Sequence, residues 1–463
     1  MPPISSRRDF LHQAGGGAGK LALASLLGSQ LAGSQLASAR DHQSPHYEAK
    51  AKNVIWLFMN GGASGIDTFD EKPVLKKWHG EFFPQKVKTL FPHPGPVMQS
   101  PYKFNKHGES GQEVSEIFPE VARHVDDLCV IRSCTSTELN HTPACYVANT
   151  GVSRVGSPAL GSFATYGLGT ENENLPGFVV MYDHRSFPEG GANLWSSGFL
   201  PPKYQGVPFR PQGEPVLYLN RSTSEYRQNH RLNLLNKLNR LHQEKNRHNP
   251  ELEARIESFE TAYRMQTAVP ELVDLSRESQ KTLDLYGLDD PKSEPFGKRL
   301  MLARKMVENG VRFQQIYHGG WDRNWDSHGS LEKNHRELAF EIDKPIAGLL
   351  TDLKRRGLLD STLVIWAGEF GRLPLSQNED GRDHNPYGFT IWMAGGGVRS
   401  GFSYGQTDEF GYKAIENPVS MNDLHATILH LMGIDHEALT FFFNGREQTM
   451  TNSLGHIVKD LCA

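Results

Sequence analysis

Short runs made only of apolar residues recur along this chain, and they restrict the folds that it can adopt. The first run, Val54–Met59, reads VIWLFM. Five more runs of strand length follow at wide intervals: Leu128–Ile131, Phe178–Met181, Phe313–Tyr317, Leu363–Ala367 and Phe389–Ala394. Strands that are apolar on both faces, with helical stretches between several of them, are typical of a mainly parallel sheet covered by helices on both sides. We therefore expect an α/β fold, with ligands bound beyond the carboxyl ends of the strands.

The stretch from about residue 216 to 306 has a different pattern. Leu234, Leu238 and Leu241 recur on one helical face, and Phe259 lies in a second amphipathic segment. Such spacing predicts two or three amphipathic helices. We interpret this stretch as a helical insertion in the α/β domain, or as a cap over its sheet.

The first forty residues have the layout of an export signal. The pair Arg7-Arg8 precedes a weakly apolar stretch rich in Gly and Ala, and Ala37-Ser38-Ala39 forms an A-x-A cleavage pattern. This order indicates a twin-arginine signal over residues 1–39, with the mature domain over residues 40–463. An ordinary amphipathic N-terminal helix is the alternative. No later stretch approaches the ~20 apolar residues that span a bilayer, so we expect a periplasmic or secreted protein without a membrane span in its mature chain.

Charge and cysteine content exclude two further classes of protein. The formal net charge is −4 at pH 7, which argues against a nucleic-acid partner because such partners require a basic face. The four cysteines do not have the spacing of a structural zinc site. A disulfide is compatible with an oxidising compartment, but the spacing does not decide which cysteines pair, and the oligomeric state is equally open.

Polar residues follow the apolar runs at their carboxyl ends. After Val54–Met59 the chain offers oxygen donors on a Gly-containing loop: Asn60, Ser64, Asp67 and Asp70. After Phe313–Tyr317 it offers carboxylates and imidazoles: His318, Asp322, Asp326, His328 and His335. Asp and His are ligands that suit zinc, manganese and other divalent ions. The alternative is a hydrogen-bonded polar rim without a metal.

Two more loops carry residues that suit anionic ligands. The run Leu363–Ala367 delivers Glu369 and Arg372, and the loop continues to Arg382, Asp383 and His384. An arginine there can fork onto a phosphate or sulfate, or it can pair with Glu369 or Asp383. Elsewhere, His141 and Thr142 precede Pro143, so a helix that begins there would place both residues at its positive end, which favours anions.

Several motifs together carry a resemblance to a known family. They are NGGASGIDTFDEKP, NHTPACYVANTG, GGWDRNWDSHG, AGEFGRLP, GRDHNPYGFTIWMAGGGVRSG and MNDLHATILHLMGIDH. With the predicted twin-arginine signal, these motifs resemble the DUF1501 family over essentially the whole mature chain. That family is similar in turn to the alkaline phosphatase and sulfatase superfamily. The resemblance implies a three-layer α/β/α sandwich with an alkaline-phosphatase-like core and the ancestry of a two-metal hydrolase.

The superfamily's site transfers only in part to this sequence. Asp326, His328 and His384 match metal ligands of its pattern, with Asp322 as an alternative to Asp326. Asn60 stands where the superfamily has a ligand Asp, and His141 stands where it has a nucleophile. Glu369-Phe370 replaces an Asp-His pair, and the chain lacks the Cys-x-Pro-x-Arg motif of formylglycine sulfatases.

The resemblance and the residues together lead to one main expectation. We expect an exported, metal-dependent hydrolase of sulfate or phosphate esters, acting on an anionic ester or a sulfated carbohydrate. The expected ligands of a divalent ion (zinc, manganese or calcium) are Asn60, Asp326, His328, Glu369 and His384. The expected catalytic residues are His141, Thr142, Arg372 and Arg382. The alternatives are a non-catalytic binding protein with a degraded metal site, and a different enzyme that uses a His-based mechanism.

Overall fold

A single large sheet organises the chain in the computed structural model. The structure describes residues 44–210, 213–216, 224–245 and 250–463, so the predicted signal over residues 1–39 lies outside the described residues. The strand order is β12-β4-β11-β8-β1-β7-β5-β6, and β15 also pairs with β4. The strands are β1 (Asn53–Met59), β4 (Leu128–Thr135), β5 (Phe178–Met181), β6 (Val207–Phe209), β7 (Phe313–His318), β8 (Thr362–Ala367), β11 (Phe389–Ala394), β12 (Phe402–Tyr404) and β15 (Val419–Ser420). All six predicted strands are therefore confirmed.

The sheet is parallel except at one strand. β1 pairs in parallel with β7 and β8, and β5 pairs in parallel with β6 and β7. β11 runs antiparallel to both of its neighbours, β8 and β4. Since β4 and β8 are both antiparallel to β11, they run in the same direction. The carboxyl ends of β1, β4, β7 and β8 and the amino end of β11 consequently lie along one edge of the sheet.

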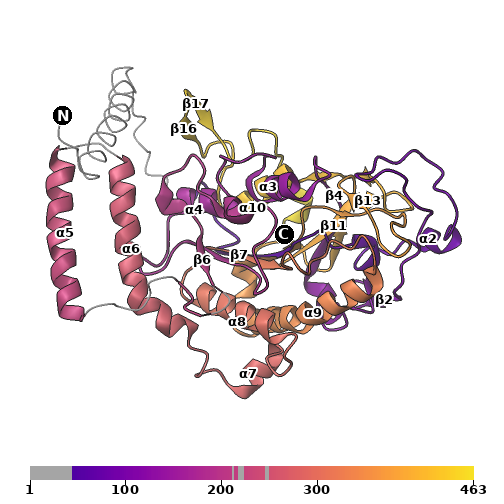
Figure 1. Cartoon of the computed structure of the whole chain (residues 1–463), viewed down its shortest axis with the longest axis horizontal. Coiled ribbons are helices and arrows are strands. Elements are labelled where there is room, and N and C mark those ends of the chain that lie inside the picture. Colours follow the sequence, from indigo (N-terminus) through magenta and orange to yellow (C-terminus); the bar gives the residue numbers. More distant parts are fainter. Residues whose placement is uncertain (1–43, 211–212, 217–223, 246–249) are drawn as a thin grey trace, which may run out of the picture. The chain divides into compact units, whose positions relative to one another are not determined.

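Helices cover both faces of this sheet, as the apolar runs predict (Figure 1). The side chains of Ile55, Leu57 and Met59 pack in one core with α8 (Glu294–Glu308) and α9 (Leu331–Arg355). The alternate side chains of β1 pack in a second core on the opposite face with α3 (His141–Thr150), α4 (Leu160–Leu168) and α10 (Met421–Leu431). Each fully buried Leu, Ile or Phe contributes ~1.5–3 kcal/mol of transfer free energy. The predicted α/β/α layering with a mainly parallel sheet is confirmed.

The remaining elements are smaller or lie beside the sheet. The other helices are α2 (Pro73–Lys77), α5 (Glu225–Lys245), α6 (Pro250–Val273) and α7 (Gln280–Leu285). Four two-stranded ribbons complete the described fold: β2 (Phe104–His107) with β3 (Gln112–Ser115), β9 (Gly371–Arg372) with β10 (His384–Asn385), β13 (Gln406–Thr407) with β14 (Ala414–Glu416), and β16 (Phe441–Phe443) with β17 (Arg446–Gln448). Among the described helices, none combines the length and apolar character that crossing a bilayer requires.

The predicted helical insertion over residues 216–306 is helical in its described part, but it is not all external to the core. Its last helix, α8, lies against α9 and β7 and belongs to one covering layer. The final turns of α6 add Met265, Val269 and Leu272 to the same core. The described helices α6 and α8 of this stretch therefore share an apolar core with the sheet.

Candidate metal centre

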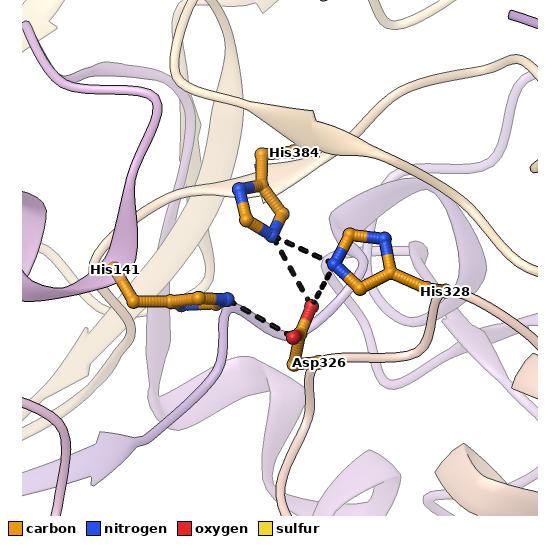
Figure 2. Close-up of side chains that lie close together, drawn as sticks. All are labelled: His141, Asp326, His328 and His384. Carbon is orange, nitrogen blue, oxygen red and sulfur yellow. Dashed lines mark hydrogen bonds and ion pairs between the residues drawn. The ribbon is translucent and has the colours of Figure 1, made fainter. Parts of the chain in front are cut away.

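Four side chains from three parts of the chain meet at the carboxyl edge of the sheet. His141 begins α3, Asp326 and His328 lie in the loop after β7, and His384 lies on β10 just before β11. One ligand atom from each side chain lies within 4.8 Å of those of the other three. Figure 2 shows the three imidazoles around the Asp326 carboxylate. We call this group the four-residue cluster.

The Asp326 carboxylate is the centre of the cluster. Its Oδ1 atom lies 2.9 Å from His328 Nε2 and 3.2 Å from His384 Nε2, and its Oδ2 atom lies 3.1 Å from His141 Nε2. The two nitrogens His328 Nε2 and His384 Nε2 are themselves 3.1 Å apart. Three imidazoles therefore present the same ring atom, Nε2, to one carboxylate.

The opposite nitrogen of each imidazole has its own acceptor. His141 Nδ1 lies 2.7 Å from Glu369 Oε1, and His384 Nδ1 lies 2.6 Å from the carbonyl oxygen of Leu139. His328 Nδ1 bonds the side-chain oxygen of Gln377. A carboxylate and a carbonyl only accept hydrogen bonds, so the Nδ1 atom of each ring is a donor, and in the neutral form of a ring the lone pair is on Nε2 and faces inward. This arrangement of outer acceptors is the one that metal-binding histidines use.

Inward lone pairs need a positive charge between them. Two neutral imidazoles cannot share a hydrogen bond through two lone pairs, and the Asp326 carboxylate only adds acceptors. A divalent cation or extra protons would resolve this repulsion. The donor set of three imidazole nitrogens and one carboxylate therefore fits a divalent metal ion.

The electrostatics of the cluster are dominated by these contacts. Burial lowers the pKa of His141, but its bonds to Asp326 and Glu369 outweigh burial and raise that pKa to about 9. Burial, together with the charge of Arg372, lowers the pKa of His384 to about 4 in spite of Asp326. Burial raises the pKa of Asp326, but Arg372 and the three histidines hold that pKa well below its ordinary value. Asp326 is consequently an ionised carboxylate throughout the physiological range.

The two arginines expected to bind an anion have other partners. The guanidinium of Arg372 is buried and lies 2.6 Å from Asp326 Oδ1, and it also donates to the carbonyl oxygens of Gly61, Gly62 and Arg382. These contacts use all but one of the side-chain N–H groups of Arg372. They fix the guanidinium beside Asp326, so Arg372 holds this carboxylate in place. The expectation that Arg372 also stabilises an anionic ester stays a prediction.

Arg382 lies outside the cluster, where it pairs with Asp67. Its Nε atom lies 2.7 Å from Asp67 Oδ2 and its Nη2 atom lies 3.1 Å from Asp67 Oδ1, and both side chains have 0% exposure. Its other donors reach the carbonyl oxygens of Leu373 and Met98. The described hydrogen bonds of this buried guanidinium go to Asp67 and to backbone carbonyl oxygens, and the expectation that Arg382 stabilises an anionic ester stays a prediction.

Two further expected ligands, Asn60 and Glu369, and the expected catalytic residue Thr142 surround the cluster without joining it. Glu369 lies behind His141, where its Oε1 atom also accepts from the backbone N–H of Gly61 at 2.9 Å. Its buried Oε2 atom has no hydrogen-bond partner among the described residues. The side-chain oxygen of Asn60 accepts from the backbone N–H of Glu189 at 3.2 Å, and Thr142 Oγ1 lies 3.4 Å from a carboxylate oxygen of Glu189. The structure therefore places Glu369, Asn60 and Thr142 in the surroundings of the site.

Further polar residues of these loops have structural roles. Ser64 donates to Asp67, and Asp70 pairs with Lys72 at 3.0 Å. His318 and His335 are buried in separate hydrogen-bonded networks, in which they contact Glu341 and Ser327 respectively. Sequence reasoning did not find Gln377 and Leu139 as partners of the cluster. Leu139 acts through its backbone, which leaves no residue-type signal, and Gln377 has only its place in a polar loop.

Comparisons with known proteins give one family and several distant structures. The model of a family described as "Protein of unknown function (DUF1501)" matches residues 51–462. The curated proteins give no match. Among solved structures, Ps i-CgsB in complex with k-i-k-neocarrahexaose is 11% identical with a TM-score of 0.37, over 83% of this chain and 72% of that chain. The PsFucS1 sulfatase from Pseudoalteromonas sp. is 13% identical with a TM-score of 0.36, over 83% and 68%. The alkaline phosphatase from the Antarctic bacterium TAB5 is 11% identical with a TM-score of 0.36, over 83% and 98%.

Proposed function

This chain belongs to the DUF1501 family, whose members are described as proteins of unknown function, and we propose that it is a metal-dependent hydrolase of sulfate or phosphate esters. The observation that carries the proposal is the four-residue cluster, in which three Nε2 atoms and one carboxylate face a common point. In the outer ring, a carboxylate, a carbonyl and an amide fix the three rings. Such preorganisation is typical of a metal centre.

The donor set narrows the choice of metal. His141, Asp326, His328 and His384 would hold the ion. Three imidazoles favour zinc or manganese over calcium, because calcium takes oxygen ligands. An ion with more than four coordination positions would keep room for a substrate, whereas a tetrahedral ion would have all four positions filled by protein. A catalytic role therefore favours an ion that accepts five or six ligands.

Charge at the site suits an anionic ester. When bound, the ion would polarise an ester oxygen and make water a better nucleophile. The Asp326 carboxylate is paired with the Arg372 guanidinium, so a divalent ion bound beside this pair would give the site a positive charge. The side chain of Asn140, at the N-cap of α3, makes no capping hydrogen bond, so the first N–H groups of that helix remain suited to an anion.

The chain's own residues take roles that differ from those expected from the sequence. We assign His141 as a ligand, because its Nε2 atom faces Asp326 and its Nδ1 atom is held by Glu369. We assign Glu369 and Arg372 as positioning residues for His141 and Asp326. Thr142 follows His141 at the start of α3, and we assign its hydroxyl to binding the ester oxygens.

Metal analysis and an ester panel test this function together. Full-length protein from an export-competent host is expected to contain about one equivalent of zinc or manganese and to hydrolyse aryl or sugar sulfates or phosphates. Removal of the metal by a chelator should abolish hydrolysis, and its return should restore hydrolysis. Metal-free native protein that is inactive on the whole panel would overturn the proposal in favour of a non-catalytic binding protein.

We also propose that the protein is exported by the twin-arginine route. The motif Arg7-Arg8 and the Ala37-Ser38-Ala39 pattern support this localisation. Replacing both arginines by Lys is expected to leave precursor of full length in the cytoplasm, which immunoblots of cell fractions would detect. A matched control replaces Lys20 by Arg and should not change export. Processed protein outside the cytoplasm in the Arg7-Arg8 variant would contradict the proposal.

A further inference from the structure

A cavity of about 460 Å³ lies beside the four-residue cluster, between two loops. One loop spans residues 91–96 and the other spans residues 376–379. The cavity is lined by the rings of Phe91 and His93, by two prolines and by polar side chains that include Gln377, Asn378 and Glu379. We call it the two-loop cavity.

The two-loop cavity shares a wall with the cluster. Gln377, which lines the cavity, bonds His328 Nδ1 through its side-chain oxygen. The ring of Phe91 meets the ring of His328 edge-on with centroids 5.0 Å apart, and its centroid lies 6.4 Å from that of His384. The cavity and the cluster are therefore neighbours, with Gln377 and Phe91 between them.

The backbone holds the walls of the cavity in a fixed relation to the cluster. Asp383 accepts from the backbone N–H of His384 with one oxygen and from the backbone N–H groups of Leu90 and Phe91 with the other. The two loops are also hydrogen-bonded to each other. The backbone N–H of Gly95 donates to the carbonyl oxygen of Ser376, and the backbone N–H of Ser376 donates to a carbonyl oxygen of the 91–96 loop. A Cβ atom at Gly95 would lie 2.2 Å from Ser376 Oγ, so the close approach requires glycine. Hydrogen bonds consequently join the two walls of the cavity to each other and to His384.

The lining of the cavity selects a kind of ligand. Of the described residues that line it, none is Lys or Arg, and Glu379 supplies a carboxylate. Amides and a carboxylate hydrogen-bond hydroxyl groups well, and an aromatic ring packs against the CH groups of a saturated ring. A second anionic group placed beside Glu379 would be repelled. The lining therefore suits a neutral ring that carries several hydroxyl groups.

We propose that the two-loop cavity binds the alcohol part of the ester, that this part is a neutral polyhydroxylated ring such as a sugar, and that Glu379 excludes rings with a second anionic group. This inference rests on the proposed function, because it assumes that the sulfate or phosphate group lies at the cluster. Phe91 packs on the ring, and Glu379 accepts hydrogen bonds from its hydroxyl groups.

A matched pair of substrates tests this selectivity. Galactose 4-sulfate and galacturonic acid 4-sulfate, with the corresponding phosphates, differ only in the hydroxymethyl or carboxylate group at C6. Wild-type protein is expected to have the lower KM for the galactose ester. The variant Glu379→Gln keeps the shape of the side chain, and it should raise the KM for the galactose ester by roughly 2- to 10-fold, as expected for the net contribution of one ordinary hydrogen bond. It should lower the KM for the galacturonic acid ester, with kcat changing less than KM in both cases.

Controls separate this inference from the proposed function. Phe91→Ala should raise the KM for both sugar esters, whereas Glu437→Gln, which changes an exposed carboxylate outside the cavity lining, should change neither. Equal changes in the two KM values for Glu379→Gln, or none, would overturn the inference while hydrolysis itself stands. If the wild type cleaves no ester, the proposed function fails. In that case, ligand-observed NMR with methyl galactoside and galacturonic acid measures the selectivity of the cavity directly. Equal binding of the two probes by wild type would overturn the inference.

Discussion

His328→Ala is expected to remove most of the bound metal and to abolish ester hydrolysis in the same preparation. The variant deletes one of four ligand atoms, and it leaves Asp326 and His384 with a gap where the Nε2 atom of His328 stood. Loss of an outer partner alone commonly costs ~10–100-fold in metal affinity, so loss of a direct ligand should cost more. Metal content by elemental analysis and kcat/KM on the best ester of the panel measure the two effects.

Gln377→Ala provides the matched comparison for His328→Ala. It leaves all four ligand atoms in place and removes only the acceptor that fixes the Nδ1 proton of His328. We expect a smaller loss of metal affinity, in the range of ~10–100-fold, with hydrolysis restored by added metal. Excess metal should not restore His328→Ala. Full metal content in His328→Ala, with ordinary stability, would show that the cluster does not hold the ion.

Arg382→Met is expected to destabilise the fold far more than the loss of an exposed ion pair does. It leaves the carboxylate of Asp67 buried beside Ser64 without its cation, and breaking a buried pair from one side costs ~3–5 kcal/mol. Urea denaturation should show this as a lower midpoint at unchanged slope. Arg123→Met is the control, because Arg123 pairs with Glu120 at 2.8 Å but its side chain is 71% exposed. An exposed pair contributes ~0–1 kcal/mol, so similar midpoints for the two variants would contradict the prediction.

The dependence of this pair on pH has a definite sign. Burial raises the pKa of Asp67, but the charge and hydrogen bonds of Arg382 outweigh burial and lower the pKa below its ordinary value of 3.8. A carboxyl group whose pKa is lower in the folded state stabilises the fold above its unfolded pKa, and this contribution is lost as the pH falls below that value. The difference in stability between wild type and Arg382→Met should therefore be largest near neutral pH and shrink in acid.

The sequence predicted the edge of the sheet where the site lies better than it predicted the roles of the residues there. Asp326, His328 and His384 follow or precede apolar strands, and parallel strands bring such loops to one edge. Glu369 also lies at this edge, but it contacts the outer nitrogen of His141, on the side of the ring that faces away from Asp326. The order of the two is set by how α3 packs on the sheet, and no local pattern in either loop encodes that packing.

The arginines show a second limit of sequence reasoning. Arg382 pairs with Asp67, which is 315 residues away in the chain, in loops that follow the paired strands β8 and β1. An arginine in a Gly-rich loop has the same local signature whether it binds a substrate or a buried carboxylate. Burial decides between the two roles, and burial is a property of the folded chain.

The reversed strand β11 has a consequence for how this site can diversify. Because β11 is antiparallel, the chain between β8 and β11 leaves the sheet and returns to it at the same edge, as a closed excursion of about twenty residues. That excursion carries Glu369, Arg372 and His384, and it also carries the loop at residues 376–379 that lines the two-loop cavity. Its tip can change in length or composition while both of its anchored ends stay in register. The tip that lines the cavity can therefore vary independently of His384, which lies at the anchored end of the excursion beside β11.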